Sequence, residues 1–180
     1  MRAVVDTNVL LSPDGRLLMS WGEPGTDPGQ FNVPHNICCD PDGWVYVADR
    51  ENHRVQVFDG DGKFETQWNN LHRRTGCAWR PAATRSSILA KKVRPERSTA
   101  IGPTSGRASA HTHKDEVLAR LGKMHTGLAP GQFTSPHGIA VDGHGDIYVG
   151  ELSARVWARL SKEPTPKRTR VIHKLVKTAA

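Results

Sequence analysis

The sequence predicts an all-β protein made of small four-stranded antiparallel units, and three observations lead to this fold class. Between residues 29 and 68, four short apolar runs alternate with turn residues. The same sequence pattern recurs at residues 131–151, and its initial Gly-Gln-Phe lies 102 residues further along the chain. No window of residues 29–68 has the length or periodicity of an amphipathic helix. Such a repeat indicates radially stacked blades, because one small sheet cannot cover both of its faces.

Turn residues set the strands of the first unit. The Pro41-Asp42-Gly43 turn and the Asp59-Gly60-Asp61-Gly62 turn favour tight reversals of the chain. The predicted strands are residues 36–39, 44–48, 55–58 and 64–68. We expect Trp44, Tyr46 and Phe58 to pack between blades, and the Asp49 carboxylate to accept bonds from loop amides. His53 and Arg54 are predicted to be solvated residues of an outer loop.

Flanking segments extend this pattern. Residues 16–21 and 117–122 are each predicted to be an outer strand followed by a Gly/Pro loop. Residues 1–12 predict a strand of a preceding blade, although Val4-Val5-Asp6-Thr7-Asn8 also resembles the first strand of PIN-domain nucleases, where Asp6 would bind a metal. The α/β pattern which that fold needs does not follow. Residues 155–160 predict a third strand of the later blade, and residues 170–176 a last strand or a basic tail.

Residues 73–115 break the pattern. This segment has ten Lys/Arg and two Asp/Glu, a net charge of +8, whereas the remaining chain carries −1. Its composition is too poor in aliphatic residues to offset the cost of chain ordering. We therefore expect it to be exposed and unpaired, either as a reading-frame shift inside one blade or as a basic disordered loop. The preserved 102-residue spacing favours the frame shift. The predicted organisation is residues 1–72, 73–115 and 116–180.

These motifs resemble the NHL-repeat β-propellers. The resemblance rests on Pro34-His35, the turn at residues 40–43 and the run of residues 45–59, and it covers residues 10–72 and 116–160. Within the family, Pro-His together with Ala48-Asp49-Arg50-Glu51-Asn52 is most similar to the peptidyl-α-hydroxyglycine α-amidating lyase branch. A ring needs at least four blades of about 40–50 residues. We therefore expect a partial, open propeller of about three four-stranded blades, one of them disordered.

The resemblance also implies a site. In the lyase branch each Pro-His histidine is a zinc ligand, which implies His35 and His137 here, and the motif arginine, Arg50 here, is a catalytic residue that binds substrate. The third zinc histidine and the tyrosine of the family have no counterpart in this sequence, and Gly138 stands where the family has a calcium-linked aspartate. The family reaction cleaves a carbinolamide such as peptidyl-α-hydroxyglycine into an amide and glyoxylate. We expect weak zinc binding and no useful turnover.

The topology of a blade gives the same grouping independently. His35 precedes the first strand and Arg50 follows the second, so both belong at one rim, and His137 occupies the equivalent place. Imidazoles that face a channel suit zinc, and a guanidinium suits a carboxylate. The alternatives are rim histidines bonded to backbone, and an Arg50 that pairs with Glu51 or Asp49.

The rival function is a non-catalytic binding module for protein or nucleic acid. A nucleic-acid partner is not favoured, because the positive charge is confined largely to residues 73–115. The lyase reading implies a small-molecule or peptide substrate, and open blade edges imply self-association. No signal peptide or membrane span is visible in the sequence, so a cytoplasmic location is the default expectation.

Overall fold

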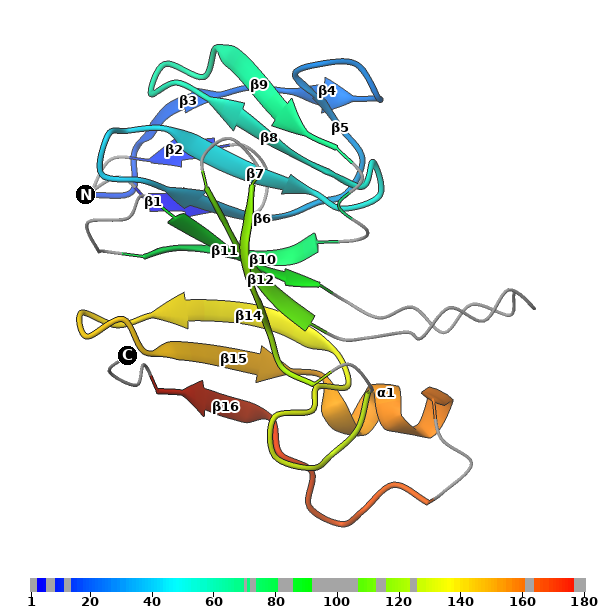
Figure 1. The fold of residues 1–180 in the computed structure, drawn as a ribbon. Coiled ribbons are helices and arrows are strands. Elements are labelled where there is room, and N and C mark those ends of the chain that lie inside the picture. Colours follow the sequence, from blue (N-terminus) through cyan, green and yellow to red (C-terminus); the bar gives the residue numbers. More distant parts are fainter. Residues whose placement is uncertain are drawn as a thin grey trace. The chain divides into compact units, whose positions relative to one another are not determined.

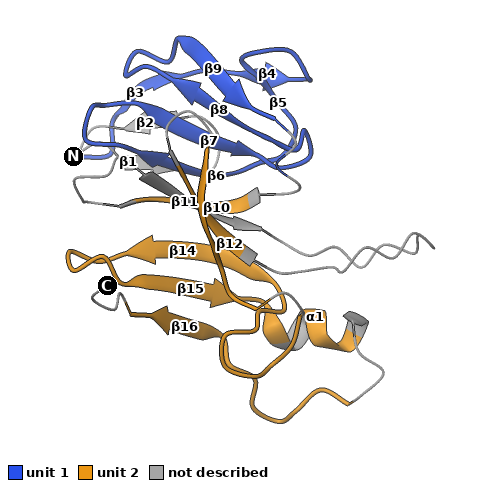
Figure 2. Ribbon diagram, in the orientation of Figure 1, with its two compact units in different colours: residues 1–74 blue, residues 75–180 orange. Residues whose placement is uncertain are grey.

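The regular elements that the computed structural model describes are β-strands in small sheets, apart from one helix (Figure 1), which confirms the predicted all-β fold class. It describes residues 3–5, 9–11, 14–69, 71, 74–80, 86–91, 107–112, 116–123, 126–160 and 164–176. The chain divides into two compact units, residues 1–74 and residues 75–180 (Figure 2). Within the described part of the chain, no helix is long and apolar enough to cross a membrane.

Unit 1 contains a three-stranded sheet, a short parallel strand pair and a four-stranded sheet. The three-stranded sheet has β1 (Ala3–Val5), β2 (Val9–Leu11) and β3 (Leu17–Ser20), and the parallel pair has β4 (Glu23–Pro24) and β5 (Gln30–Phe31). The four-stranded sheet has β6 (Pro34–Cys39), β7 (Val45–Asp49), β8 (Arg54–Phe58) and β9 (Phe64–Trp68). Its order β6-β7-β8-β9 is an antiparallel meander, as the turn spacing predicted.

The core of unit 1 lies on one face of this meander. Side chains alternate between the faces of a strand, so Val45 and Val47 pack with Phe58 and Phe31 on that face. The Phe58 ring contacts the rings of Trp21, Phe31 and Phe64, with centroids 5.7–6.0 Å apart. On the other face, Tyr46 lies against Trp68. The prediction that Tyr46 and Phe58 are core residues is confirmed, whereas Trp44 is only partly buried.

The turn between the first two strands of each Pro-His sheet is closed by an aspartate. Asp40 Oδ1 accepts bonds from the amides of Asp42 and Trp44, at 3.0 and 2.9 Å, and Asp40 Oδ2 accepts a bond from the Tyr46 hydroxyl at 2.9 Å. Burial, and then the bond to Asp40, raise the pKa of Tyr46 well above its ordinary value. A tyrosine that bonds to its turn aspartate therefore ties the hairpin to the sheet.

Unit 2 repeats this turn at the corresponding positions. Asp142 Oδ1 accepts bonds from the amides of His144 and Asp146, and the Tyr148 hydroxyl bonds to Asp142 Oδ2 at 3.2 Å. Partial desolvation opposes ionisation of Asp142, but the amides of Asp146 and His144 outweigh it and lower the pKa of this carboxyl. The turn is thus a repeated device, which is more buried in unit 1.

Among its described residues, unit 2 contains two sheets and one helix. The first sheet has β10 (Arg74–Arg80), β11 (Ser86–Lys91), β12 (Arg107–Thr112) and β13 (Val117–Leu121). The second has β14 (Pro136–Val141), β15 (Ile147–Glu151) and β16 (Ile172–Leu175), with α1 (Ser153–Leu160) inserted between β15 and β16.

The expectation that residues 73–115 are exposed and unpaired is wrong for the described residues. Strands β10, β11 and β12 form a four-stranded sheet with β13, and β11 pairs with β12 along its whole length. Several of their side chains are buried, among them Thr75, Cys77 and Ala108. Alternating small apolar and hydroxyl residues can form a blade if neighbouring strands supply the apolar surface. His113 lies outside the described residues, as do residues 81–85 and 92–106.

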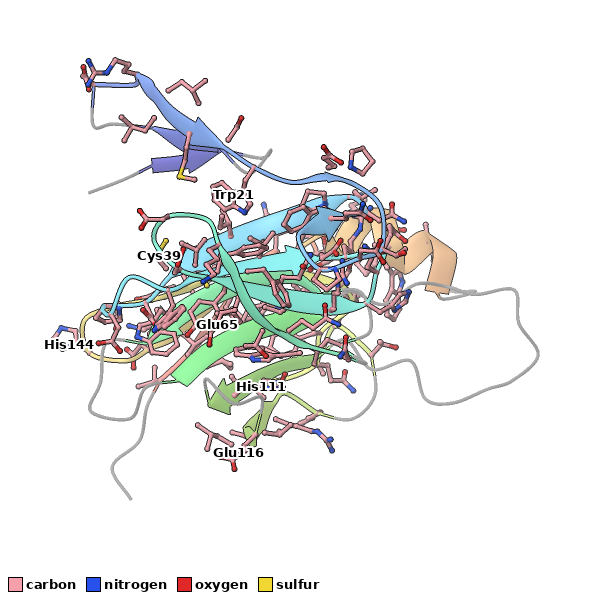
Figure 3. All side chains as sticks on the ribbon, turned by 90° about the horizontal axis from the view of Figure 1, so that it is seen from above. Trp21, Cys39, Glu65, His111, Glu116 and His144 are labelled. Atoms are coloured by element: carbon pink, nitrogen blue, oxygen red, sulfur yellow. The ribbon has the colours of Figure 1, made fainter. Side chains whose placement is uncertain are left out.

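His111 belongs to this corrected segment. Its ring is 1% exposed, and its Nε2 lies 2.7 Å from the Ser109 hydroxyl, two residues away on the same face of β12 (Figure 3). Its bond to Ser109 shows that it is a partnered residue within the sheet.

A second correction concerns residues 155–160, which were predicted to be a strand. They lie in helix α1, where the Val156 amide bonds to the Leu152 carbonyl. The Ser153 hydroxyl donates to the Arg170 carbonyl and so connects the start of the helix to the segment before β16. Val156 is buried, and residues 153–160 include alanine, arginine and leucine, which favour helix. The third strand of this sheet is therefore β16, within residues 170–176, which were predicted to be a strand or a tail.

Candidate functional site

His35 occupies an irregular position at one end of the unit 1 meander. Pro34 pairs with Asp49 and Asn36 pairs with Ala48, so His35 is the extra residue of a β-bulge. The register also places Arg50, which directly follows β7, at the same end of the sheet as His35, as predicted. Bulges redirect a side chain and are common beside binding sites. The His35 side chain is partly buried and partnered.

His137 has the same position in unit 2. Pro136 pairs with Glu151 and Gly138 pairs with Gly150, so His137 is again the extra residue of a bulge at the start of the first strand. Its side chain is also partly buried and partnered. The repeat in the sequence is thus a repeat of backbone geometry at both Pro-His steps.

A buried carboxylate holds the chain in front of each bulge. Asp49 is fully buried, and its Oδ1 accepts a bond from the Asn32 amide at 2.8 Å. In return, the Glu51 amide donates to the Asn32 carbonyl. The expected structural role of Asp49 as an acceptor of loop amides is confirmed. Glu151, 102 residues later, has the same task, because its Oε1 accepts bonds from the amides of Thr134 and Ser135 at 2.6 and 2.9 Å.

Arg54 is the cation beside Asp49, and the prediction that it is a solvated loop residue is wrong. It is 5% exposed, and its Nε donates to Asp49 Oδ2 at 2.8 Å. Its five hydrogen bonds reach the carboxylate of Asp49, the side chain of Gln67 and the carbonyls of Thr26, Asp27 and Gln30. Arg54 therefore fastens the loop of residues 22–29 onto the sheet. Because Arg54 is buried and its hydrogen bonds are charge-assisted, it stabilises this part of the fold.

The side chain that bonds Glu151 is a histidine from a different strand. His173 on β16 places Nε2 2.6 Å from Glu151 Oε2, and both side chains are buried. The His173 ring also stands edge-on to Phe133, with centroids 4.9 Å apart. Position 156, which corresponds to Arg54, lies in α1 and carries a valine. The sequence reasoning missed His173, because no repeat spacing leads to it.

Arg50 is engaged within its own blade. Its Nε donates to Glu51 Oε1 at 2.9 Å, and both side chains are partly buried. This confirms the alternative in which Arg50 pairs with a neighbouring carboxylate. A guanidinium has five donors, so the ion pair with Glu51 leaves it the capacity to bind a further anion.

The metal-ligating groups of the described residues form no complete metal site. His35 belongs to unit 1 and His137 to unit 2. No cluster of three or more His, Cys, Asp or Glu side chains that could hold a metal ion occurs in the part of the chain that the structure describes. A catalytic zinc takes at least three protein ligands, so the two histidines fit part of such a ligand set.

Comparisons with known proteins agree with this geometry. A family model for the NHL repeat matches residues 31–58, which run from before the bulge to the end of β8. NHL repeat-containing protein 3 of Mus musculus is 34% identical over 161 residues, which is 82% of this chain and 40% of the relative. Peptidyl-glycine alpha-amidating monooxygenase A of Xenopus laevis is 30% identical over 158 residues, 81% of this chain and 16% of the relative. The chain thus spans less than half the length of these relatives.

Solved structures show the same fold at low sequence identity. A protein of unknown function from Bacteroides caccae has a TM-score of 0.59 at 13% identity, over 93% of this chain and 54% of its own. A gluconolactonase from Xanthomonas campestris has a TM-score of 0.52 at 16% identity, over 79% of this chain and 48% of its own. Fold, bulged Pro-His steps and sequence matches together define a repeat protein built of propeller blades. The chain contains an NHL repeat and is similar to NHL-repeat proteins, among them the amidating monooxygenases.

Proposed function

We propose that this chain forms part of a lyase-type NHL-propeller rim, in which His35 and His137 are zinc ligands and Arg50 binds a substrate carboxylate. The observation that supports this most is the shared bulge, because both histidines are the extra residue at the start of a first strand. A bulge that recurs at the same place in two blades favours a common task for the residue that it redirects.

The proposal is limited to binding. Two imidazoles fill part of a zinc ligand set, and zinc bound there would act as a Lewis acid on a substrate oxygen. The chemistry that this chain itself supplies is the Arg50 guanidinium, which Glu51 orients through an ion pair at 2.9 Å. Such a group recognises the carboxylate of a small-molecule or peptide substrate. We expect weak zinc binding and no turnover from this chain alone.

Zinc titration of the full chain tests the proposal. Calorimetry should show weak binding, and His35→Ala or His137→Ala should each lower the affinity by at least roughly tenfold, since even outer-shell changes cost 10–100-fold. His144→Ala is the matched control, because His144 lies in the β14–β15 turn (Figure 3). Equal zinc affinity in all three variants would overturn the zinc assignment. A glyoxylate-release assay with a carbinolamide peptide should stay at background.

A non-catalytic binding module is the second candidate, and the Arg50–Glu51 ion pair favours it. An arginine that is already paired need not bind substrate, and the relatives include Protein brain tumor of Drosophila melanogaster, 28% identical over 131 residues. The rim would then bind a protein partner, or a nucleic acid, without zinc. If zinc affinity is the same without His35 and His137, this second function replaces the first.

A further inference from the structure

The peptide bond in front of His137 is held from both sides by buried side chains. On its N-terminal side, Glu151 Oε1 accepts bonds from the amides of Thr134 and Ser135 at 2.6 and 2.9 Å. Pro136 has no amide proton, so the Ser135 amide is the last backbone donor before His137. Glu151 therefore bonds the backbone donor that lies nearest to His137 on its N-terminal side.

The carbonyl of that same peptide bond has its own anchor. The Thr75 hydroxyl on β10 donates to the Pro136 carbonyl at 3.0 Å, and Thr75 is 1% exposed. This carbonyl and the His137 amide belong to one planar peptide unit. The orientation of the unit therefore sets the direction in which the His137 side chain leaves the bulge.

A third contact keeps the carboxylate in place. His173 Nε2 lies 2.6 Å from Glu151 Oε2, and the Phe133 ring stands against the imidazole. A carboxylate accepts only, so the Nε2 atom of His173 must carry a proton and donate it to Glu151. The Glu151 side chain thereby has fixed partners on both oxygens.

We propose that Thr75 and Glu151, the latter held by His173, are positioning residues that fix the direction of the His137 imidazole at its bulge. Thr75 lies on β10, in the segment whose composition predicted disorder. This positioning role rests on the proposed function in one respect only, namely that the positioned His137 imidazole would bind zinc. The positioning itself is a property of the metal-free chain.

A merely structural role would have different consequences. If Thr75 and Glu151 only stabilise unit 2, their loss lowers the resistance to unfolding but leaves the imidazole of the folded chain where it was. If they position His137, the folded chain shows a displaced or mobile imidazole. The environment of the ring in folded protein therefore separates the two roles.

Nuclear magnetic resonance of the full, metal-free chain with isotope-labelled histidine makes this measurement. The chain has nine histidines, and the His137 signals are assigned by their loss in His137→Gln. Thr75→Val keeps the shape of the side chain but removes the donor, so it should shift or broaden the His137 ring signals and leave those of His35 unchanged. Thr75→Ser keeps the hydroxyl and should restore them. Thr165→Val is the matched control, because Thr165 is exposed in the loop before β16.

Glu151→Asp supplies a second variant if Thr75→Val does not fold. The shorter side chain cannot reach both amides as Glu151 does, so the Ser135 amide should exchange with solvent roughly tenfold faster, as expected for the loss of one charge-assisted bond. The His137 signals should move as well. Unchanged His137 signals in folded Thr75→Val or folded Glu151→Asp would overturn the proposal.

Adding zinc alone to the same samples separates this inference from the proposed function. If both hold, Thr75→Val lowers zinc affinity by about tenfold, as outer-shell changes do, and Thr165→Val does not. If Thr75→Val moves the His137 ring but no sample binds zinc, the positioning role stands and the metal role fails. If zinc binds equally to wild type and to Thr75→Val with unmoved ring signals, the positioning role fails and the metal role stands.

Discussion

The two Pro-His blades share one backbone frame but stabilise it with different side chains. In unit 1 the carboxylate before the bulge is Asp49, paired with the permanently charged Arg54, whereas in unit 2 it is Glu151, paired with His173. The first blade has four strands, and the second has three strands and a helix. The repeat therefore preserves a buried carboxylate with a side-chain nitrogen partner, but not the strand from which that partner comes.

The difference is one of connectivity as well as charge. Arg54 follows Asp49 after one short turn and also bonds three loop carbonyls. His173 reaches Glu151 from 22 residues further along the chain and bonds that carboxylate alone among the described residues. Arg54 thus combines the pairing with a carboxylate and the attachment of a loop, whereas His173 supplies only the pairing in the described part of the chain.

Removal of Arg54 or of His173 should show the largest difference between the blades. Arg54→Leu removes the charged partner of the buried Asp49 carboxylate and a donor to the carbonyls of Thr26, Asp27 and Gln30, so we expect a loss of about 3–5 kcal/mol in the free energy of unfolding. His173→Leu removes the partner of Glu151 Oε2 and should lower the free energy of unfolding by about 1–3 kcal/mol. Urea denaturation of both variants, with fluorescence detection, makes the comparison. Equal losses would show that the additional bonds of Arg54 contribute nothing.

Alkaline pH should act on unit 1 through Tyr46. Because its pKa is raised, folded Tyr46 keeps a proton that the unfolded chain releases above about pH 10. Stability should therefore fall as the pH rises past 10, by roughly 1 kcal/mol per pH unit. Phenolate absorbance in Tyr148→Phe, which leaves Tyr46 as the remaining tyrosine, measures this. The signal should appear together with unfolding, and a phenolate that forms in the folded chain near pH 10 would contradict the prediction.

Relief of backbone strain should stabilise unit 1 by a smaller amount. Val33, directly before Pro34-His35, has φ 54°, a left-handed conformation that a β-branched residue rarely adopts. Asparagine tolerates this conformation, and Val33 is about half exposed, so Val33→Asn should gain about 1 kcal/mol. Thermal unfolding measures the gain. Ser135→Asn, at the equivalent buried position, is the control and should destabilise the protein. A gain in stability there would show that the effect of Val33→Asn does not come from the φ of Val33.

The smallest change in stability is expected at the edge of the three-stranded sheet. Strand β16 is last in the order β14-β15-β16, and Ile172 on it is 65% exposed. An unpaired edge with apolar side chains promotes pairing between chains. Ile172→Lys should reduce self-association in analytical ultracentrifugation and change the free energy of unfolding by less than about 0.5 kcal/mol. Unchanged association would place the contact between copies elsewhere.

The sequence predicted the parts of this protein that depend on local patterns. Turn residues and alternation were enough for the meander of β6 to β9, and the repeat placed His35 and His137 in equivalent positions. The resemblance to NHL repeats rested on the same residues, and the comparisons bear it out. Local patterns succeed here because hairpin turns and strand alternation involve neighbours within a few residues.

Composition misled the prediction where packing supplies what the segment lacks. Strands β10 to β12 have few aliphatic residues, yet Thr75 and Ala108 are buried and Thr75 bonds Pro136. Similarly, residues 153–160 are helical although the first blade has a strand at the equivalent place. The composition of a segment gives the apolar surface of that segment alone, and not the apolar surface that neighbouring strands supply in the fold.

By itself, the sequence determined the strand order within the first blade, the Pro-His repeat and the role of the Asp49 carboxylate. Only the tertiary structure decided which side chain pairs with each carboxylate, that Arg54 is buried, and that Thr75 bonds the peptide unit before His137. The physical reason is distance along the chain. Asp49 and Arg54 are close in sequence, but Glu151 meets His173, and Pro136 meets Thr75, only after separate strands have been brought together, and no local pattern records such contacts.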